Sequence, residues 1–513
     1  MRESSRMVRH ALSMMAGTCV SRVLGLMREV MTAAFFGASG QLDAFNVAYT
    51  LANTARQLVA EGALSAAFVP VFSRALETGR NRALSLARQA MSVLIAASLG
   101  VTLLGILGAP LLTLVMAPGF DAETSLLTTA LTRWMFPFLF LISLAALAMG
   151  TLNSLGSFFV PALAPAFSNL IFIVSAPFFV RRFGVLGLAF SVLAGGFTHF
   201  ASQWLWARRI GAALFPERPD FSDPDLRRMM ALFLPYAAGL SLNQVNPVVS
   251  RMLGSFLEEG SISVLNYANR VIQLPLGLFV IAVSQAVLPQ LSRAGEPEDF
   301  IAAIGDALRF ALFIVLPTAC GLIFVSSAFV HLIFVRGAFG ESAWRATSWA
   351  LTLSALGLPG MACSTVVMRG LYALSMPRAA FMTTLFSVSC TAVLSFLLMF
   401  PMGFGGLALA PSVAFSLSGF LGLFYIRKKM GRPLGILPLS WVLRSALALV
   451  SMLAALALYL HLTPYVPSAP LLSRAVWCMG AAAGGGFVYA AATLALGFDE
   501  WRWIKDAVTG KRK

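Results

Sequence analysis

Long apolar runs separated by short polar stretches make up most of the chain. A transmembrane α-helix needs about 20 consecutive, mainly apolar residues, and roughly fourteen stretches reach that length. None shows the alternation over about ten residues that is typical of an outer-membrane barrel strand. The pattern therefore predicts an all-α polytopic membrane protein. The predicted spans are residues 11–36, 43–72, 88–116, 125–151, 158–180, 184–207, 229–256, 261–289, 303–334, 343–371, 378–400, 404–426, 441–462 and 474–498.

The composition supports this class. The chain is 58% hydrophobic and 11% charged, whereas soluble domains carry about 25% charged residues. The first span does not resemble a cleavable signal peptide, because Arg22 and Arg28 interrupt its apolar core and no small-residue cleavage site follows. The five cysteines are scattered among apolar spans without a C-x-x-C pair, so we expect no disulfide framework, no metal site and no cofactor.

The chain has a formal net charge of +16, and its basic residues are distributed unevenly along the sequence. If the spans simply alternate, about 24 basic residues fall on one side of the membrane and about five on the other. The positive-inside rule then predicts that both termini are cytoplasmic. We therefore attribute the basic excess to topology and lipid headgroups rather than to a nucleic-acid partner. The loops on the opposite side are short, which excludes a sizeable external domain.

Two similar segments indicate an internal repeat. FVPVFSRALE (68–77) and VLPQLSRAGE (287–296) share Pro, Ser, Arg, Ala and Glu at an offset of 219 residues. Gly150 and Gly370 lie at nearly the same offset. An even number of spans per repeat keeps both copies in one orientation, as in parallel transporter repeats. The predicted organisation is two six-helix lobes and an addition of two helices with a basic tail, with boundaries 1–225, 226–430 and 431–513.

Charged residues inside the predicted spans follow one-sided stripes. Each arginine near the centre of a span costs about 2.5–3.5 kcal/mol by insertion scales if it faces lipid. Side chains at helical spacing share a face, so these stripes are expected to face an interior. Arginines outnumber carboxylates among them, which predicts a cationic cavity between the lobes. The stripes comprise Arg22, Gly25, Arg28 and Glu29 in the first span, Asn53 and Arg56 in the second, and Asn266, Asn269, Arg270 and Gln273 in the eighth.

An alternative is that intramembrane arginines reach the lipid headgroups or form internal ion pairs. We favour that reading for Arg133, Arg309 and Arg444, which lie near span ends, and leave Arg251 open. For the arginines of the stripes we favour a ligand site. The planar guanidinium matches phosphate geometry, so the cavity predicts an anionic, phosphorylated substrate. An exporter of cationic drugs would need the opposite balance of charge.

Three segments carry a family resemblance: SRVLGLMREV (21–30), FFGASGQLDAFNVAYTLANTARQLVAEGALSAAFVPVFSR (35–74) and LNYANRVIQLPLGLF (265–279). They are similar to the MurJ family, also called MviN, of bacterial lipid II flippases. This family lies within the multidrug/oligosaccharidyl-lipid/polysaccharide exporter superfamily. The resemblance implies a transporter rather than an enzyme, located in the bacterial cytoplasmic membrane. It also implies that the substrate is the undecaprenyl-pyrophosphate-linked peptidoglycan precursor, moved from the inner to the outer leaflet for cell wall synthesis.

The resemblance and the stripes together define the predicted site. Some relatives carry an acid where Asn269 stands here, and some are thought to bind sodium through acids on the seventh and eleventh helices. Residues 234–250 and 379–398 contain no acid, so we do not expect that sodium site. The predicted substrate-binding residues are Arg22, Arg28, Arg56, Arg270, Ser21 and Asn53. The predicted gating or supporting residues are Asp43, Glu29, Glu61 and Asn269.

The expected mechanism is alternating access, with lipid II and membrane lipids as partners and the cell-wall synthesis machinery as a further one. No G-x-x-x-x-G-K-[ST] loop occurs, so the chain has no recognisable nucleotide engine. Membrane potential, a proton gradient and a sodium gradient all stay open as driving forces. Two other functions also stay open: a flippase for another polyprenyl-linked oligosaccharide, and a polytopic glycosyltransferase, which would need catalytic carboxylates in an external loop.

Overall fold

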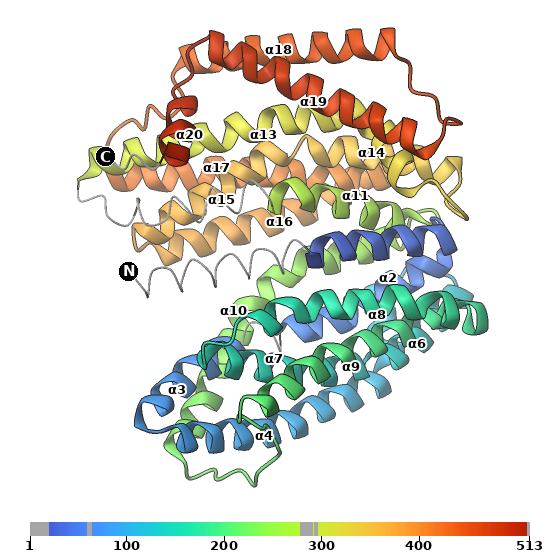
Figure 1. The fold of residues 1–513 in the computed structure, drawn as a ribbon, viewed down its shortest axis with the longest axis vertical. Helices are drawn as coiled ribbons and strands as arrows, with labels where there is room; N and C mark the ends of the chain where they lie inside the picture. Colours follow the sequence, from blue (N-terminus) through green and yellow to red (C-terminus); the bar gives the residue numbers. More distant parts are fainter. Residues whose placement is uncertain (1–19, 59–63, 278–290, 292–295, 510–513) are drawn as a thin grey trace. The chain divides into compact units, whose positions relative to one another are not determined.

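The computed structural model describes residues 20–58, 64–277, 291 and 296–509. These residues are almost entirely helical and include no strand, which confirms the all-α class. The chain forms two compact units, Met1–Ser263 and Val264–Lys513, and each is described by itself (Figure 1). Glu61 and most of the second repeat segment, 287–296, lie outside the described residues.

Glycine and proline divide the first unit into more helices than the hydropathy pattern predicts. Predicted span 88–116 is two helices that meet at Gly108, and 125–151 is two helices that meet just before Pro137. Proline suits the first turn of a helix, where its missing N–H has no partner to lose. The helices are 20–36, α2 (Gly40–Arg56), α3 (Ser65–Thr78), α4 (Arg80–Leu107), α5 (Ala109–Met116), α6 (Ala122–Met135), α7 (Pro137–Ser154), α8 (Phe159–Phe183), α9 (Leu186–Arg209) and α10 (Pro224–Gly254).

The second unit ends in two long helices, α18 and α19, which run along α13 (Figure 1). Their contact is apolar, with Met452 and Leu456 packed in one cluster with Phe313 and Tyr489. The Tyr489 hydroxyl donates to the Phe313 carbonyl at 3.0 Å. The helices are α11 (Ser261–Pro275, which begins in the first unit), α13 (Pro297–Phe334), α14 (Glu341–Ala355), α15 (Leu358–Ala373), α16 (Pro377–Met402), α17 (Phe404–Met430), α18 (Leu439–Leu462), α19 (Leu471–Ala495) and α20 (Glu500–Thr509).

Among the described residues, eight helices are long and apolar enough to cross a membrane. A ninth span results if α14 and α15, which bend by 41° at their junction, are taken together. Within the described residues, α2 and α11, which carry polar stripes, are not among these helices. The protein is therefore a multi-span membrane protein, and the total of about fourteen spans stays a prediction.

The order of helices in the first unit recurs in the second. Helices α6, α7, α8 and α9 have 14, 18, 25 and 24 residues, and α14, α15, α16 and α17 have 15, 16, 26 and 27. The turn between α8 and α9 contains Gly184 at φ 57° and ψ −138°, and the turn between α16 and α17 contains Gly403 at φ 56° and ψ −131°. Both are backbone conformations that favour glycine. This agreement supports the predicted repeat.

A second glycine, in the first turn of the following helix, allows the paired helices to approach closely. A Cβ atom on Gly187 would lie 2.4 Å from the Phe179 carbonyl carbon, and one on Gly406 would lie 2.2 Å from the Leu398 carbonyl oxygen. Backbone cannot move aside as a flexible side chain can. The short segment Gly-x-x-Gly-Leu-Ala, at 184–189 and again at 403–408, therefore encodes the same tight hairpin twice.

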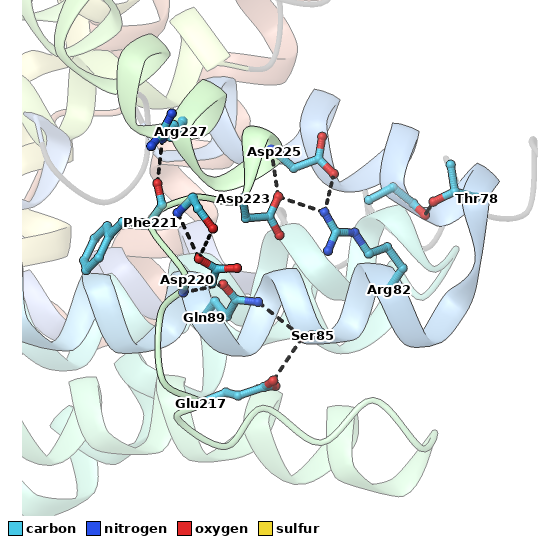
Figure 2. A network of polar contacts seen from close by, with 12 residues as sticks. Thr78, Arg82, Ser85, Gln89, Glu217, Asp220, Phe221, Asp223, Asp225 and Arg227 are labelled. Carbon is cyan, nitrogen blue, oxygen red and sulfur yellow. Dashed lines mark hydrogen bonds and ion pairs between the residues drawn. The ribbon is translucent and has the colours of Figure 1, made fainter.

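The linker before α10 is fastened to α4 rather than left as a loose tether (Figure 2). The Arg82 guanidinium bonds Asp223 Oδ1 at 2.8 Å and Asp225 Oδ2 at 3.3 Å. Asp223 is 3% exposed in its side chain and also caps α10 by accepting from the Asp225 N–H. The Gln89 side chain accepts from the Asp220 N–H at 2.9 Å, and hydrogen bonds from Ser222 hold the pKa of the Asp220 carboxyl below its usual value.

These contacts place α10 in the first compact unit, where it packs on α3. The lobes predicted at 1–225, 226–430 and 431–513 rest on the sequence repeat and the number of spans, whereas the compact units reflect packing. The lobe boundaries therefore stay a prediction. The polar residues of 215–228 are explained by packing, because this stretch supplies the hydrogen-bond and ion-pair partners of Arg82 and Gln89 in α4.

We expect Gly187→Ala and Gly406→Ala to lower the thermal midpoint of the purified protein. Overpacking of this kind costs about 1–3 kcal/mol. The matched controls are Gly100→Ala in α4 and Gly321→Ala in α13, where an added Cβ meets nothing within 4 Å. Because alanine is the better helix former, the controls should leave the midpoint unchanged or raise it. An equal fall in all four variants would contradict the hairpin argument.

We expect Arg82→Gln to loosen the start of α10, because Asp223 and Asp225 lose their ion pairs. Limited trypsin digestion followed by mass spectrometry should show cleavage after Arg227 about fivefold faster than in the wild type, as a loss of about 1 kcal/mol implies. Arg74→Gln, which changes an exposed arginine of α3, is the control. Identical cleavage rates in Arg82→Gln and Arg74→Gln would refute the fastening role.

Candidate functional site

Arg28 is held by groups from three helices of the first unit. Its Nη2 lies 3.0 Å from Glu29 Oε1, and the two side chains are 17% and 11% exposed. Its Nη1 lies 3.5 Å from Asn169 Oδ1 of α8. The guanidinium also lies 5.4 Å from the ring centroid of Tyr49 in α2 and 5.5 Å from that of Phe172 in α8. A cation over aromatic faces is stabilised by the ring quadrupole, so this interior position suits a positive charge.

Asn169 is a site residue that the sequence analysis missed. Its side-chain amide donates to the Ser21 carbonyl at 3.2 Å, while its oxygen faces Arg28. It thus connects α8 to Ser21 and to Arg28, two turns apart on helix 20–36. An asparagine inside the mainly apolar segment 158–180 was the available signal, because polar groups at membrane depth need a partner. Arg22 and Ser21, the other predicted residues of this helix, are partly buried.

The stripe on α2 has the predicted one-sided form. Arg56 Nε donates to Asn53 Oδ1 at 2.9 Å, as residues three apart on a helix allow. At Gln57, the C-cap residue of α2, the side-chain Oε1 accepts from the Gln244 amide of α10 at 2.6 Å. Polar contacts therefore continue from α2 to α10.

Asp43, near the start of α2, caps the beginning of α11. Its Oδ2 accepts from the Gly260 N–H at 2.7 Å, and its Oδ1 accepts from the Ser263 N–H at 2.7 Å and the Ser263 hydroxyl at 2.6 Å. Asp43 is 2% exposed. The N-terminus of a helix attracts an anion through its free N–H groups and its dipole. This buried carboxylate therefore positions the start of α11.

Arg251, whose role the sequence left open, belongs to the same junction. Its Nε donates to Thr50 Oγ1 of α2 at 3.2 Å, and its Nη1 donates to the Ile262 carbonyl of α11 at 3.2 Å. Asn46 adds a bond from its amide to Ser263 Oγ at 3.1 Å. Arg251 thus joins α10 to α2 and α11.

Helix α11 carries the third predicted stripe into the second unit. Along it, Asn266 and Arg270 are partly buried, and Asn269 and Gln273 are exposed. Because Arg270 belongs to the second unit and Arg22, Arg28 and Arg56 to the first, a cavity shared by the four arginines stays a prediction. Glu61 falls outside the described residues.

The arginines expected to act structurally lie elsewhere. Arg309 forms an ion pair with Asp306 one turn earlier on α13, which confirms the internal-pair reading. Arg133 and Arg444 are exposed, as expected of side chains that reach lipid headgroups. The cysteines within the described residues are all free.

Comparison with known proteins identifies the family. A family model described as lipid II flippase MurJ matches residues 32–473. A probable lipid II flippase MurJ from Rhizobium meliloti is 32% identical over 509 residues, which cover 96% of this chain and 94% of the relative. A lipid II flippase MurJ from Burkholderia cenocepacia is 30% identical over 82% of this chain and 84% of its own length.

Solved structures agree with the sequence matches. A lipid II flippase MurJ in an inward closed conformation matches with a TM-score of 0.78 and 27% identity, over 94% of this chain and 97% of that structure. An inward-facing MATE family multidrug transporter has a TM-score of 0.70 at 16% identity, over 83% of this chain, which shows a shared fold. These matches indicate a transporter rather than an enzyme. The family match covers most of the sequence, and the chain belongs to the MurJ family of lipid II flippases.

Proposed function

We propose that this chain translocates lipid II, the undecaprenyl-pyrophosphate-linked peptidoglycan precursor, from the inner to the outer leaflet of the bacterial cytoplasmic membrane. The observation that carries the proposal is the family match over residues 32–473. Family membership makes the chain a multi-span protein of that membrane, and lipid II export places it in cell wall synthesis.

Arg22, Arg28, Arg56 and Arg270 are proposed to bind the pyrophosphate, with Ser21 and Asn53 beside them. Support comes from Arg28 itself. Its side chain is largely buried, and its guanidinium has more N–H donors than the Glu29 carboxylate alone can accept. Guanidinium groups bind phosphate oxygens through paired, charge-assisted hydrogen bonds. In this proposal the pyrophosphate takes up the remaining donors, and Glu29 and Asn169 orient the guanidinium.

Transport is proposed to proceed by alternating access. The arginines bind the pyrophosphate while the site is open to the cytoplasm, the prenyl chain stays in lipid, and the lobes then open the site to the other side. An inside-negative membrane potential favours outward movement of an anion by about 2.3 kcal/mol per charge per 100 mV. Potential can therefore supply the driving force, and a proton or sodium gradient can reset the carrier.

The positive-inside distribution of arginine and lysine supports cytoplasmic termini. The cell-wall synthesis machinery is proposed as the receiver of the exported precursor, because lipid II must be polymerised after it reaches the outer leaflet.

Asp43 is proposed to support transport by fixing the start of α11, the helix that carries Arg270 and Asn269. Glu61 is also proposed to support the site, and this proposal rests on the sequence alone.

Leaflet-resolved labelling of lipid II tests the function. Cells depleted of the protein should accumulate lipid II that an external reagent cannot reach, and restoring the wild-type chain should expose it. If labelling were unchanged on depletion while a different polyprenyl-linked oligosaccharide accumulated inside, the substrate assignment would be wrong.

Complementation of the depleted cells tests the arginines. Arg270→Gln and Arg28→Gln should lower outer-leaflet lipid II about tenfold or more, because a hydrogen bond to a charged group is worth about 1.5–3 kcal/mol. Arg28→Lys keeps the charge but not the paired donors and should restore only part of the transport. Arg133→Gln is the control for loss of a basic residue. The cavity proposal fails if Arg270→Gln, expressed at the wild-type level, transports as well as Arg133→Gln.

We expect Asp43→Asn to loosen the start of α11. The amide cannot accept all three hydrogen bonds and turns an N–H toward other donors, which costs about 1.5–3 kcal/mol. Hydrogen exchange followed by mass spectrometry should be faster over residues 260–263 than in the wild type. The control is Asp121→Asn at the exposed cap of α6, where the carboxylate accepts from the Glu123 N–H at 3.2 Å. If hydrogen exchange over residues 260–263 were unchanged in Asp43→Asn, Asp43 would not cap the start of α11.

A further inference from the structure

One face of α17 changes from apolar to basic near the C-terminal end of the helix. At about 100° per residue, Phe420, Phe424, Arg427, Lys428 and Gly431 share this face. Phe420 is 70% exposed and Phe424 is 58% exposed. The opposite face packs into the unit through buried side chains such as Ile426. In a membrane-spanning helix, exposed phenylalanines of this kind contact acyl chains, so the basic residues lie where the helix leaves the hydrocarbon.

A cavity of about 300 Å³ opens at this basic end. Three of its lining residues are cations, and no acid is among those of the described chain that line it. Pockets for small ligands begin at about this size. The lining residues are Phe424, Arg427, Lys428, Gly431, Arg432 and Pro433.

The turn after α17 completes the cavity. Gly431 adopts a left-handed conformation, with φ 67°, that ends the helix. Arg432 then forms an ion pair with Glu298 in the first turn of α13, which links the turn to that helix. Among the described residues, Arg427 and Lys428 have no acidic partner within ion-pair distance. Two cations therefore face the cavity without a compensating carboxylate.

We propose that this cavity binds the phosphate headgroup of an anionic membrane phospholipid, with Arg427 and Lys428 on the phosphate and the acyl chains along Phe424 and Phe420. Arginine and lysine are the usual ligands of phosphate, and basic pockets at the cytoplasmic ends of membrane helices suit anionic headgroups. The continuous path from basic cavity to exposed aromatic rings favours a lipid over a free anion. The site lies in α17 and its following turn, apart from the arginines proposed to bind lipid II.

Lys429 provides a matched control. It is exposed, as Lys428 is, but at helical spacing it lies on the other side of α17 from Phe420, and it does not line the cavity. Lys428→Gln and Lys429→Gln therefore remove the same charge from adjacent positions, and only one of them should affect the site.

The purified chain in neutral detergent is titrated with phosphatidylglycerol, with phosphatidylcholine and with soluble glycerol phosphate, and bound lipid is measured by native mass spectrometry. Wild type and Lys429→Gln should prefer phosphatidylglycerol over phosphatidylcholine to the same extent. Lys428→Gln and Arg427→Gln should each lose about fivefold in affinity for phosphatidylglycerol, the effect of one basic group at an anionic surface.

Three results would overturn the proposal. An equal loss in Lys429→Gln would indicate general surface charge rather than a site. Wild-type affinity for phosphatidylglycerol in Lys428→Gln and Arg427→Gln would show that these two residues do not bind the headgroup. Competition by glycerol phosphate at the same concentration as the lipid would mean that the occupant is a free phosphate. None of these readouts depends on lipid II transport, so the result is independent of the proposed function.

Discussion

A guanidinium at membrane depth must be compensated, and the way Arg28 meets this constraint organises the first unit. Glu29 supplies charge, Asn169 supplies an oxygen, and Tyr49 and Phe172 supply aromatic faces. These groups come from helix 20–36, α2 and α8, so the position of the charge depends on how the three helices pack. Full neutralisation would leave nothing for a ligand. A site that binds and releases an anion needs cations that are held in place but retain donors.

The buried carboxylate of Asp43 must be compensated in the same way, although its charge is negative. It is satisfied by N–H groups and a hydroxyl at the start of α11 rather than by a cation alone. Arg251 and Asn46 complete the junction. This arrangement fixes the N-terminus of the helix that carries Arg270, at the point where the first compact unit gives way to the second. The polar residues of α2 thus hold the start of α11.

Much of this was predicted correctly from the sequence. The all-α class follows from the long apolar runs, and the shared face of Asn53 and Arg56 follows from spacing along one helix. The ion pair of Arg309 is one of the two roles expected of an arginine near a span end. The contacts of Asn169 and Asp43 could not be predicted in this way, because their partners are more than 140 residues distant in sequence and depend on packing. The hairpin glycines at 184 and 403 were visible as a repeated Gly-x-x-Gly-Leu-Ala, but only their left-handed backbone reveals why they recur.

In the proposed site, intramembrane arginines receive a pyrophosphate. The most direct measurement compares binding of undecaprenyl pyrophosphate and undecaprenol to the purified chain, since the two ligands share a prenyl tail and differ in the charged group. We expect undecaprenyl pyrophosphate to bind at least about tenfold more tightly than undecaprenol, as even one charge-assisted hydrogen bond implies. Equal affinity for the two ligands would contradict it, because the arginines would then contribute nothing to recognition.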